Sequence, residues 1–271
     1  MHASPVFIAA LMVGLMPALA LAGTPVFVGK KAASQQSMNE VDHSGWDALL
    51  KRYVDEDGLV NYRGWHKSTA DRKALDNYLA ELSTGSLSAP ADKSAKLAFW
   101  INAYNAVTVK GILQQYPTTS IRNHTPRLFG FHIWHDLKLY VAGKPYSLDQ
   151  IEHQVLRKMS EPRIHFAIVC ASIGCPRLLN HAYVAGKLDE QLTTNAQDFF
   201  SRKRNFRYAQ SENRFYLSSI LSWFGEDFGR DQKAQLRKIA KWLPTTASQQ
   251  AARGASVRVS YVSYDWDLNK Q

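Results

Sequence analysis

The feature that most constrains the fold is a run of twenty residues, Lys96 to Gln115, with the sequence KLAFWINAYNAVTVKGILQQ. Apolar side chains fall on nearly every side of a helical wheel drawn through it, which is typical of a helix that is buried all round. Two amides, Asn102 and Asn105, lie three residues apart and share one edge of that helix. Leaving a buried amide unsatisfied costs about 1–3 kcal/mol. We therefore expect a helix through the middle of the fold, whose amides either tie it to neighbouring loops or face a site.

The rest of the chain is expected to form more helices and a few irregularly spaced strands. Periodicity and capping patterns predict helices at 46–54, 70–82, 147–159 and 187–200, hairpins at 139–145 and 206–217, and strands at 163–170 and 257–261. The chain has 271 residues, 45% of them hydrophobic, which is enough for one full-sized core or two small ones. We predict a single globular α+β domain, rich in helix, with a small mixed or antiparallel sheet packed on the central buried helix.

The N-terminus has the composition of a secretory signal peptide. Residues 7–22, FIAALMVGLMPALALA, carry no charge and end in small residues before Gly23. This run is shorter than the roughly 20 residues that a spanning helix needs. We expect residues 1–22 to be a signal peptide, 23–40 a flexible leader and 41–271 the folded domain. The mature protein is then periplasmic or secreted, and it is not an integral membrane protein.

The net charge narrows the class of partner. Lys and Arg outnumber Asp and Glu by 33 to 23, which gives a net charge of +10. A basic chain favours anionic surroundings. Because export separates the protein from nucleic acid, we expect no nucleic-acid partner, and instead an anionic envelope polymer or a protein partner.

One carboxylate is expected on a buried surface. On a regular helix over 147–159, Glu152 falls within the apolar arc, His153 lies to one side and Arg157 points nearly opposite. A carboxylate on a buried face must be paired, hydrogen-bonded or protonated. Glu152 is therefore either half of a structural ion pair, with Arg163 or another arginine, or a residue with an orienting or acid-base role.

The only two cysteines, Cys170 and Cys175, allow two main interpretations. In an exported protein they can form a disulfide, because the turn-forming residues between them can bring them together. Alternatively, one of them is a nucleophile. In that case Cys175 or Cys170 attacks, His165 is the base and Glu152 fixes the imidazole, as in thiol hydrolases.

Spacing limits the partners of each cysteine. In a regular strand, His165 would lie about 16 Å from Cys170 and on the opposite face, so these two cannot form a dyad there. Cys175 is freer, and Cys170 could meet His153 or His181 instead. A zinc site made of His165, both cysteines and His181 has suitable ligand types but unusually long spacings. We predict no metal and no cofactor.

Five strings together resemble one family. They are FWINAYNAVTVKGIL, SLDQIEHQVLR, RIHFAIVCASIGCPRL, LSSILSWFGEDFG and YDWDLN. They occur in this order in the domain-of-unknown-function 547 (DUF547) family, which is found in bacterial exported proteins and in plant proteins with a leucine-zipper segment. The resemblance covers about residues 46–269. It implies no activity, and because the zipper segment is absent it implies no coiled-coil self-association. The positions that match its motifs are Asn102, Asn105, Glu152, His153, His165, Cys170 and Cys175.

These observations define one expected site and two functions. We expect a polar pocket between the helix that carries Asn102, the helix that carries Glu152 and the loop after His165. If the protein is an enzyme, it is a thiol-dependent hydrolase or acyl transferase that acts on peptide or amide bonds. The alternative is a non-catalytic envelope binding module, stabilised by a disulfide between Cys170 and Cys175.

Overall fold

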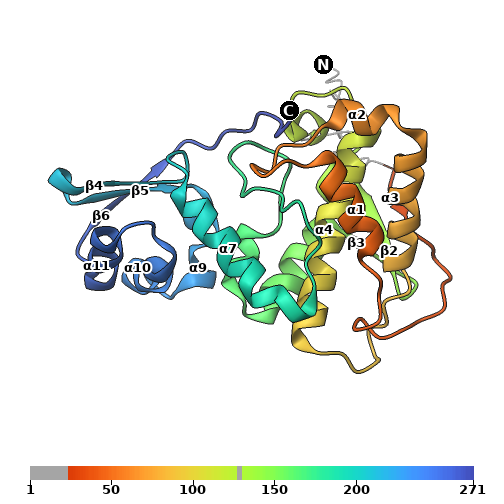
Figure 1. Ribbon diagram of the computed structural model, residues 1–271, viewed down its shortest axis with the longest axis horizontal. Coiled ribbons are helices and arrows are strands. Elements are labelled where there is room, and N and C mark those ends of the chain that lie inside the picture. The colour runs from red at the N-terminus through yellow and green to blue at the C-terminus, as the bar shows by residue number, and fades with distance from the viewer. Residues whose placement is uncertain (1–23, 127–129) are drawn as a thin grey trace, which may run out of the picture.

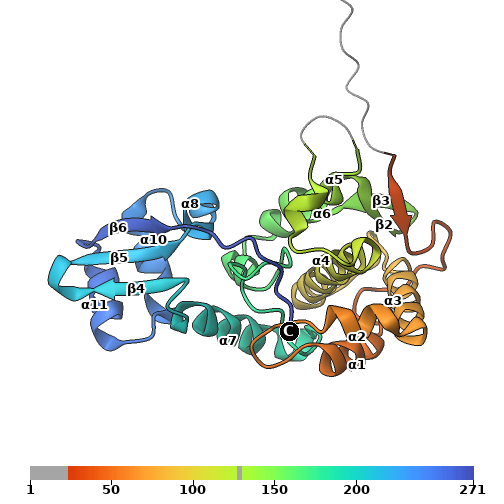
Figure 2. The same ribbon diagram turned by 90° about the horizontal axis from the view of Figure 1, so that it is seen from above.

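Helix α4, Lys93–Gln115, forms the axis of the larger of two hydrophobic cores. The structure is a computed structural model that describes residues 24–126 and 130–271. Seventeen of the 23 residues of α4 are buried, including both amides. In Figure 2, α4 lies between a layer of helices and a layer that contains a sheet. The expectation of a helix covered on all sides is confirmed.

Three helices form one side of this first lobe. They are α1 (Ser44–Tyr53), α2 (Tyr62–Lys67) and α3 (Thr69–Leu82). Side chains start two of them, because Asn61 accepts a hydrogen bond from the backbone of Gly64 and Ser68 accepts one from Asp71. Large aromatic residues fill the space between the three helices. The indole of Trp46 lies 5.8 Å from the ring of Tyr78, stacked almost parallel to it.

A small mixed sheet covers the other side of α4. Its strands are β1 (Val26–Val28), β2 (Leu137–Val141) and β3 (Lys144–Ser147), in that order; β1 runs parallel to β2, and β2 and β3 form the expected hairpin. Strand β1 lies in the segment expected to be a flexible leader, and Val28 is buried in the core. The short helices η1 (Ile121–His124) and α5 (Ile133–Asp136) precede β2.

The segment after β3 is helical, but it is not a regular α-helix. The capping box of Ser147 and Gln150 starts α6 (Leu148–Gln150) as expected. A π-helix, η2 (Ile151–Leu156), and a 3₁₀ turn, η3 (Arg157–Met159), follow directly. A π-turn changes the direction of every later side chain relative to an α-helix.

The strand expected at 163–170 is wrong. Residues Pro162–Phe166 form a 3₁₀ helix, η4, and the chain then continues without regular structure. The run is as buried as expected, but a short apolar run does not by itself distinguish a strand from another buried conformation. Its backbone is satisfied by a side chain instead of a neighbouring strand. The amide of Asn105 donates to the carbonyl of Ala167 at 2.9 Å and accepts from the N–H of Val169 at 3.0 Å.

The second lobe has a separate core rich in phenylalanine. After η5 (Ala185–Lys187), helix α7 (Leu188–Ser201) begins in the first core and ends in the second. The second mixed sheet has the order β4 (Phe206–Ala209), β5 (Arg214–Ser218) and β6 (Arg258–Val262), with η6 (Gln210–Glu212) in the hairpin turn. The remaining helices of the second lobe are α8 (Ile220–Trp223), α9 (Gly225–Phe228), α10 (Gln232–Ile239), η7 (Ala240–Trp242) and α11 (Thr246–Gly254). Figure 1 shows this lobe at one end of the molecule. The α+β class is confirmed, with the helices and small sheets divided between two cores.

After β6 the chain returns to the first lobe. Leu268 is buried in the first core, and backbone hydrogen bonds of 2.8 Å join Ile173 to Asp267 and Gly174 to Asp265. A β-carbon at Gly174 would lie 2.9 Å from backbone atoms of Asp265, so only glycine permits this close approach. The C-terminal segment is thereby fixed against the loop that carries the cysteines.

Within residues 24–126 and 130–271, no helix has both the length and the apolar character required to cross a bilayer. The expected signal peptide, 1–22, lies outside the described residues.

Candidate functional site

A cavity of about 250 Å³ opens where the two lobes meet. Tyr104 of α4 and Glu152 of η2 line it from the first lobe, and Phe224, directly after α8, lines it from the second. The loop with both cysteines and the returning C-terminal segment complete its walls. The cavity therefore unites parts of the chain that are far apart in sequence.

The two cysteines lie side by side in this wall. Both are free cysteines, and their sulfur atoms are 2.6 Å apart. Ala171, next to Cys170, has a φ of 57°, in the left-handed region that non-glycine residues rarely occupy. Backbone strain of this kind costs of order 1–3 kcal/mol and clusters at functional sites. This conformation bends the loop so that the N–H of Cys170 donates a hydrogen bond to the sulfur of Cys175 at 2.9 Å.

Tyr264 adds a second donor to the same sulfur. Its hydroxyl donates to Sγ of Cys175 at 3.0 Å and accepts a hydrogen bond from Ser172 at 2.9 Å. Burial alone would raise the pKa of Cys175, but the hydrogen bonds from Cys170, Tyr264 and the backbone outweigh it and lower this pKa to about 6. The pKa of Cys170 is raised well above its usual value by its contact with Cys175 and by burial. Of the two sulfurs, Cys175 therefore loses its proton more readily than Cys170.

Glu152 lies in the same cavity as a carboxyl group of raised pKa. Burial is the main cause, and the nearby charge of Cys175 adds to it. Its single hydrogen-bond partner among the described residues is the hydroxyl of Tyr104, which donates to Oε2 at 3.1 Å. The expected ion pair with Arg163 is wrong, because Arg163 binds Glu161 and Asp189 instead. A raised pKa favours the protonated form, so Glu152 is suited to act as an acid.

His165 lines the cavity, but its carboxylate partner is not Glu152. Its Nε2 lies 2.6 Å from Oδ2 of Asp227, and its ring stacks on Phe224 at 4.3 Å. Burial lowers the pKa of His165 to about 4, against the opposing effect of Asp227, so the imidazole is neutral at pH 7. The orienting role expected for Glu152 is therefore filled by Asp227.

Arg157 is part of this arrangement instead of pointing away from it. Its guanidinium donates to both carboxylate oxygens of Asp227, at 2.6 and 3.0 Å, and also binds Glu226. The expectation that Arg157 faces the opposite side assumed a regular α-helix, whereas the π-helix changes its direction. His153 lies at the rim of the cavity, with its side chain 40% exposed.

The amides of α4 hold the site without lining it. Asn102 exchanges two hydrogen bonds with the backbone of Tyr183, at 2.8 and 2.9 Å. Asn105 holds the segment that leads into Cys170, through Ala167 and Val169. Of the two alternatives for these residues, the geometry favours a tie to neighbouring loops.

The residues of the expected zinc alternative are not brought together. His181 lines a different cavity from His165 and the cysteines, and its Nδ1 lies 3.7 Å from Asp47. Within the described part of the chain, no group of three or more His, Cys, Asp or Glu side chains has the arrangement of a metal site.

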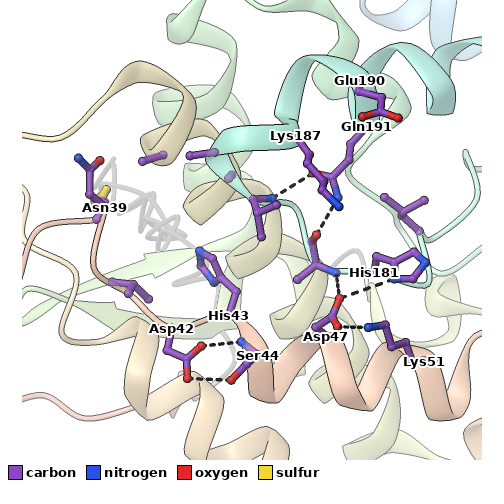
Figure 3. A pocket seen from close by; sticks show the side chains of 18 of the residues that line it. Asn39, Asp42, His43, Ser44, Asp47, Lys51, His181, Lys187, Glu190 and Gln191 are labelled. Atoms are coloured by element: carbon purple, nitrogen blue, oxygen red, sulfur yellow. Dashed lines mark hydrogen bonds and ion pairs between the residues drawn. The ribbon is translucent and has the colours of Figure 1, made fainter.

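A larger cavity, of about 750 Å³, surrounds His181 (Figure 3). Three of its ionisable groups, Asp47, Lys51 and His181, already lie against one another. Asp47 binds Lys51 at 2.6 Å and accepts a hydrogen bond from the backbone of Ala182 at 3.0 Å. The smaller cavity, which holds the two sulfurs and a carboxyl of raised pKa, is therefore the better candidate for chemistry.

Sequence reasoning missed three residues of the smaller cavity and its surroundings. Tyr104, Asp227 and Tyr264 were not singled out, although each lies in one of the five strings quoted above. Asp227 and Tyr264 are 62 and 89 positions from the groups they bind, so no local spacing connects them.

One comparison with known proteins found a family match over part of the chain. Residues 88–200 match the family model described as "Protein of unknown function, DUF547". This range is shorter than the 46–269 over which the motifs resemble the family; it includes α4 and both cysteines, and ends before Asp227 and Tyr264. Searches of curated proteins and of solved structures found no match.

Proposed function

The chain carries a DUF547 domain, whose family has no assigned activity, and we propose from its cavity that it is a thiol-dependent acyl transferase or hydrolase acting on peptide or amide bonds. The observation that carries this proposal is the environment of Cys175. Its sulfur accepts hydrogen bonds from the Cys170 backbone and from Tyr264, and it lies 2.6 Å from the Cys170 sulfur. A thiolate, unlike a thiol, is a strong nucleophile.

The proposed reaction divides a difficult step into two easier ones. The thiolate of Cys175 attacks the carbonyl carbon of the substrate, the C–N bond breaks, and the leaving amine takes the proton of the Glu152 carboxyl. The product of this step is a thioester on Cys175. Water or an acceptor amine then attacks the thioester and gives its proton to the Glu152 carboxylate, and Cys175 leaves as a thiolate. His165, fixed by Asp227, lines the same space and is the second acid-base candidate.

The test is to trap the thioester. The purified protein is treated with p-nitrophenyl acetate, p-nitrophenol release is followed, and intact mass is measured after acid quenching. We expect a burst of p-nitrophenol and one acetyl group on Cys175 in the wild type, and neither in Cys175→Ser. Equal acetylation of the wild type and Cys175→Ser would overturn the proposal.

A disulfide between Cys170 and Cys175 is the second candidate state, because the two sulfurs are only 2.6 Å apart. A small movement would bring them to the bonding distance of about 2.05 Å. Oxidation by an external disulfide would form the S–S bond and release two thiols from the oxidant. The protein would then be the non-catalytic envelope module, binding an anionic polymer or a protein partner through its basic surface. A thiol count before and after reduction, on protein isolated from a bacterial periplasm, separates the two: a quantitative bridge supports the binding module and excludes the nucleophile.

Export remains part of the proposal. Removal of residues 1–22 would place the protein in the periplasm or outside the cell. N-terminal sequencing of protein recovered from those fractions should begin at Gly23. Recovery of the full-length chain from the cytoplasm alone would contradict it.

A further inference from the structure

Aromatic rings form much of the cavity wall near the cysteines. Trp134, Trp223, Tyr264 and Trp266 all line it. Their rings are in mutual contact, with centroids of Tyr264 and Trp266 4.6 Å apart, of Trp223 and Tyr264 4.9 Å apart, and of Trp223 and Trp266 6.0 Å apart. Trp223 is 49% exposed, although a ring of this size is usually well buried. Rings grouped in this way can present several faces to one small ligand.

The ionisable groups that line the cavity include the carboxyl groups of Asp149 and Glu152 and the imidazoles of His135, His153 and His165. Cys175 lines it as well, whereas within residues 24–126 and 130–271 no lysine or arginine does. The described lining thus lacks the Lys and Arg side chains that give the whole chain its net charge of +10. A cation that enters the cavity therefore meets ring faces and the carboxylate of Asp149, which lies 3.8 Å from Nε2 of His153.

One of these rings, that of Trp266, already has a cation against it. The guanidinium carbon of Arg122 lies 5.3 Å from the centroid of Trp266, within cation–π distance. Arg122 does not line the cavity, so it leaves the space inside the cavity to a ligand. At about 250 Å³, this space suits one small group better than a drug-sized molecule.

We infer that this cavity binds a small ammonium group, quaternary or primary, between the tryptophan rings and the side chain of Asp149, and so selects substrates that carry such a cation close to the reacting acyl carbon. The inference rests on the proposed function in taking the bound group to be part of the substrate. The binding itself does not require the chemistry. Rings that surround an ammonium group attract it through their negative faces, and a neighbouring carboxylate adds a Coulombic attraction.

The test compares two probes of the same shape. Choline and 3,3-dimethylbutan-1-ol differ in having a charged nitrogen or a neutral carbon at the centre of three methyl groups. Each is titrated into the full chain while tryptophan fluorescence is recorded, in the wild type and in Cys175→Ser. We expect choline to bind at least about tenfold more tightly than the neutral alcohol in the wild type, and to remain the tighter ligand in Cys175→Ser. Equal affinities for the two probes would overturn the inference.

Two matched variants locate the effect. Asp149→Asn should weaken choline binding about threefold or more and leave the alcohol unaffected, and Trp223→Leu should remove most of the fluorescence change. Asp267→Asn makes the same charge change at an exposed residue next to Trp266 that does not line the cavity, and it should bind choline as the wild type does. An equal loss in the Asp149 and Asp267 variants would show a general charge effect and overturn the inference. Because binding is measured without turnover, a failure here is distinguishable from a failure to trap the thioester.

Discussion

The proposal for Cys175 depends most directly on one hydroxyl group. Tyr264→Phe removes the donor that lies 3.0 Å from Sγ of Cys175 and keeps the ring in place. A hydrogen bond to a charged group contributes about 1.5–3 kcal/mol. Since one pKa unit corresponds to about 1.4 kcal/mol, the pKa of Cys175 should rise by about one to two units. The wild-type pKa is about 6, so the variant should titrate at about 7 to 8.

The assay is the rate of alkylation of Cys175 by iodoacetamide as a function of pH, followed by mass spectrometry. At pH 6, half of the wild-type sulfur is thiolate, and the calculated rise in pKa lowers the rate about five- to fiftyfold. Well above pH 8 the two rates should converge. Tyr216→Phe is the matched control, because its hydroxyl binds Glu212 in the second lobe. An unchanged midpoint in Tyr264→Phe would refute the account of how the thiolate is stabilised.

Three further predictions concern the groups around the cavity. Because burial lowers the pKa of His165 from 6.5 to about 4, the folded state takes up this proton less readily than the unfolded state, and stability is lost as the pH falls from 6.5 to 4. The loss is about 3 kcal/mol, and urea unfolding at the two pH values should show a smaller loss in His165→Gln. Asp227→Asn removes the negative charge at His165 and should lower the pKa of His165 further, which an NMR titration would show; an unchanged pKa would count against the pair. Asn105→Ala leaves the carbonyl of Ala167 and the N–H of Val169 without their partner, and should lower the free energy of unfolding by about 2–5 kcal/mol, where a loss below 1 kcal/mol would contradict the bridging role.

The sequence predicts correctly those helices and turns whose conformation is determined by residues within the element itself. The helix around Asn102 is apolar on all sides, and no other regular structure buries such a run. The capping box at Ser147 and the hairpin at 139–145 depend on neighbouring residues, and both are present, although the hairpin turns at Ala142 and Gly143 and Pro145 already lies in the second strand. The prediction of a strand at 163–170 is wrong because it depended only on the apolar character of this segment. An amide on another helix, Asn105, decides its conformation, and nothing within the segment shows this.

The sequence predicts which residues line the site better than it predicts which residues they bind. Glu152, His165 and both cysteines do line one cavity, whereas the partner of each came from elsewhere in the chain. A helical wheel with a fixed step per residue could not place Arg157, because the π-helix interrupts that step. The division into two cores could not be predicted from the sequence either, because the composition allows one core or two.

The position of the cavity between two cores explains why the sulfur and its donor are so far apart in the chain. Tyr264 packs against both cores, and the segment that carries it is held to the cysteine loop by backbone hydrogen bonds at Gly174 and Ile173. The position of this hydroxyl therefore depends on contacts with both cores. A thiolate buried without such donors would be costly, because burial alone raises its pKa. The low pKa of Cys175 is in this sense a property of the complete fold, and any perturbation that separates the C-terminal segment from the first lobe should return the cysteine to its unreactive, protonated form.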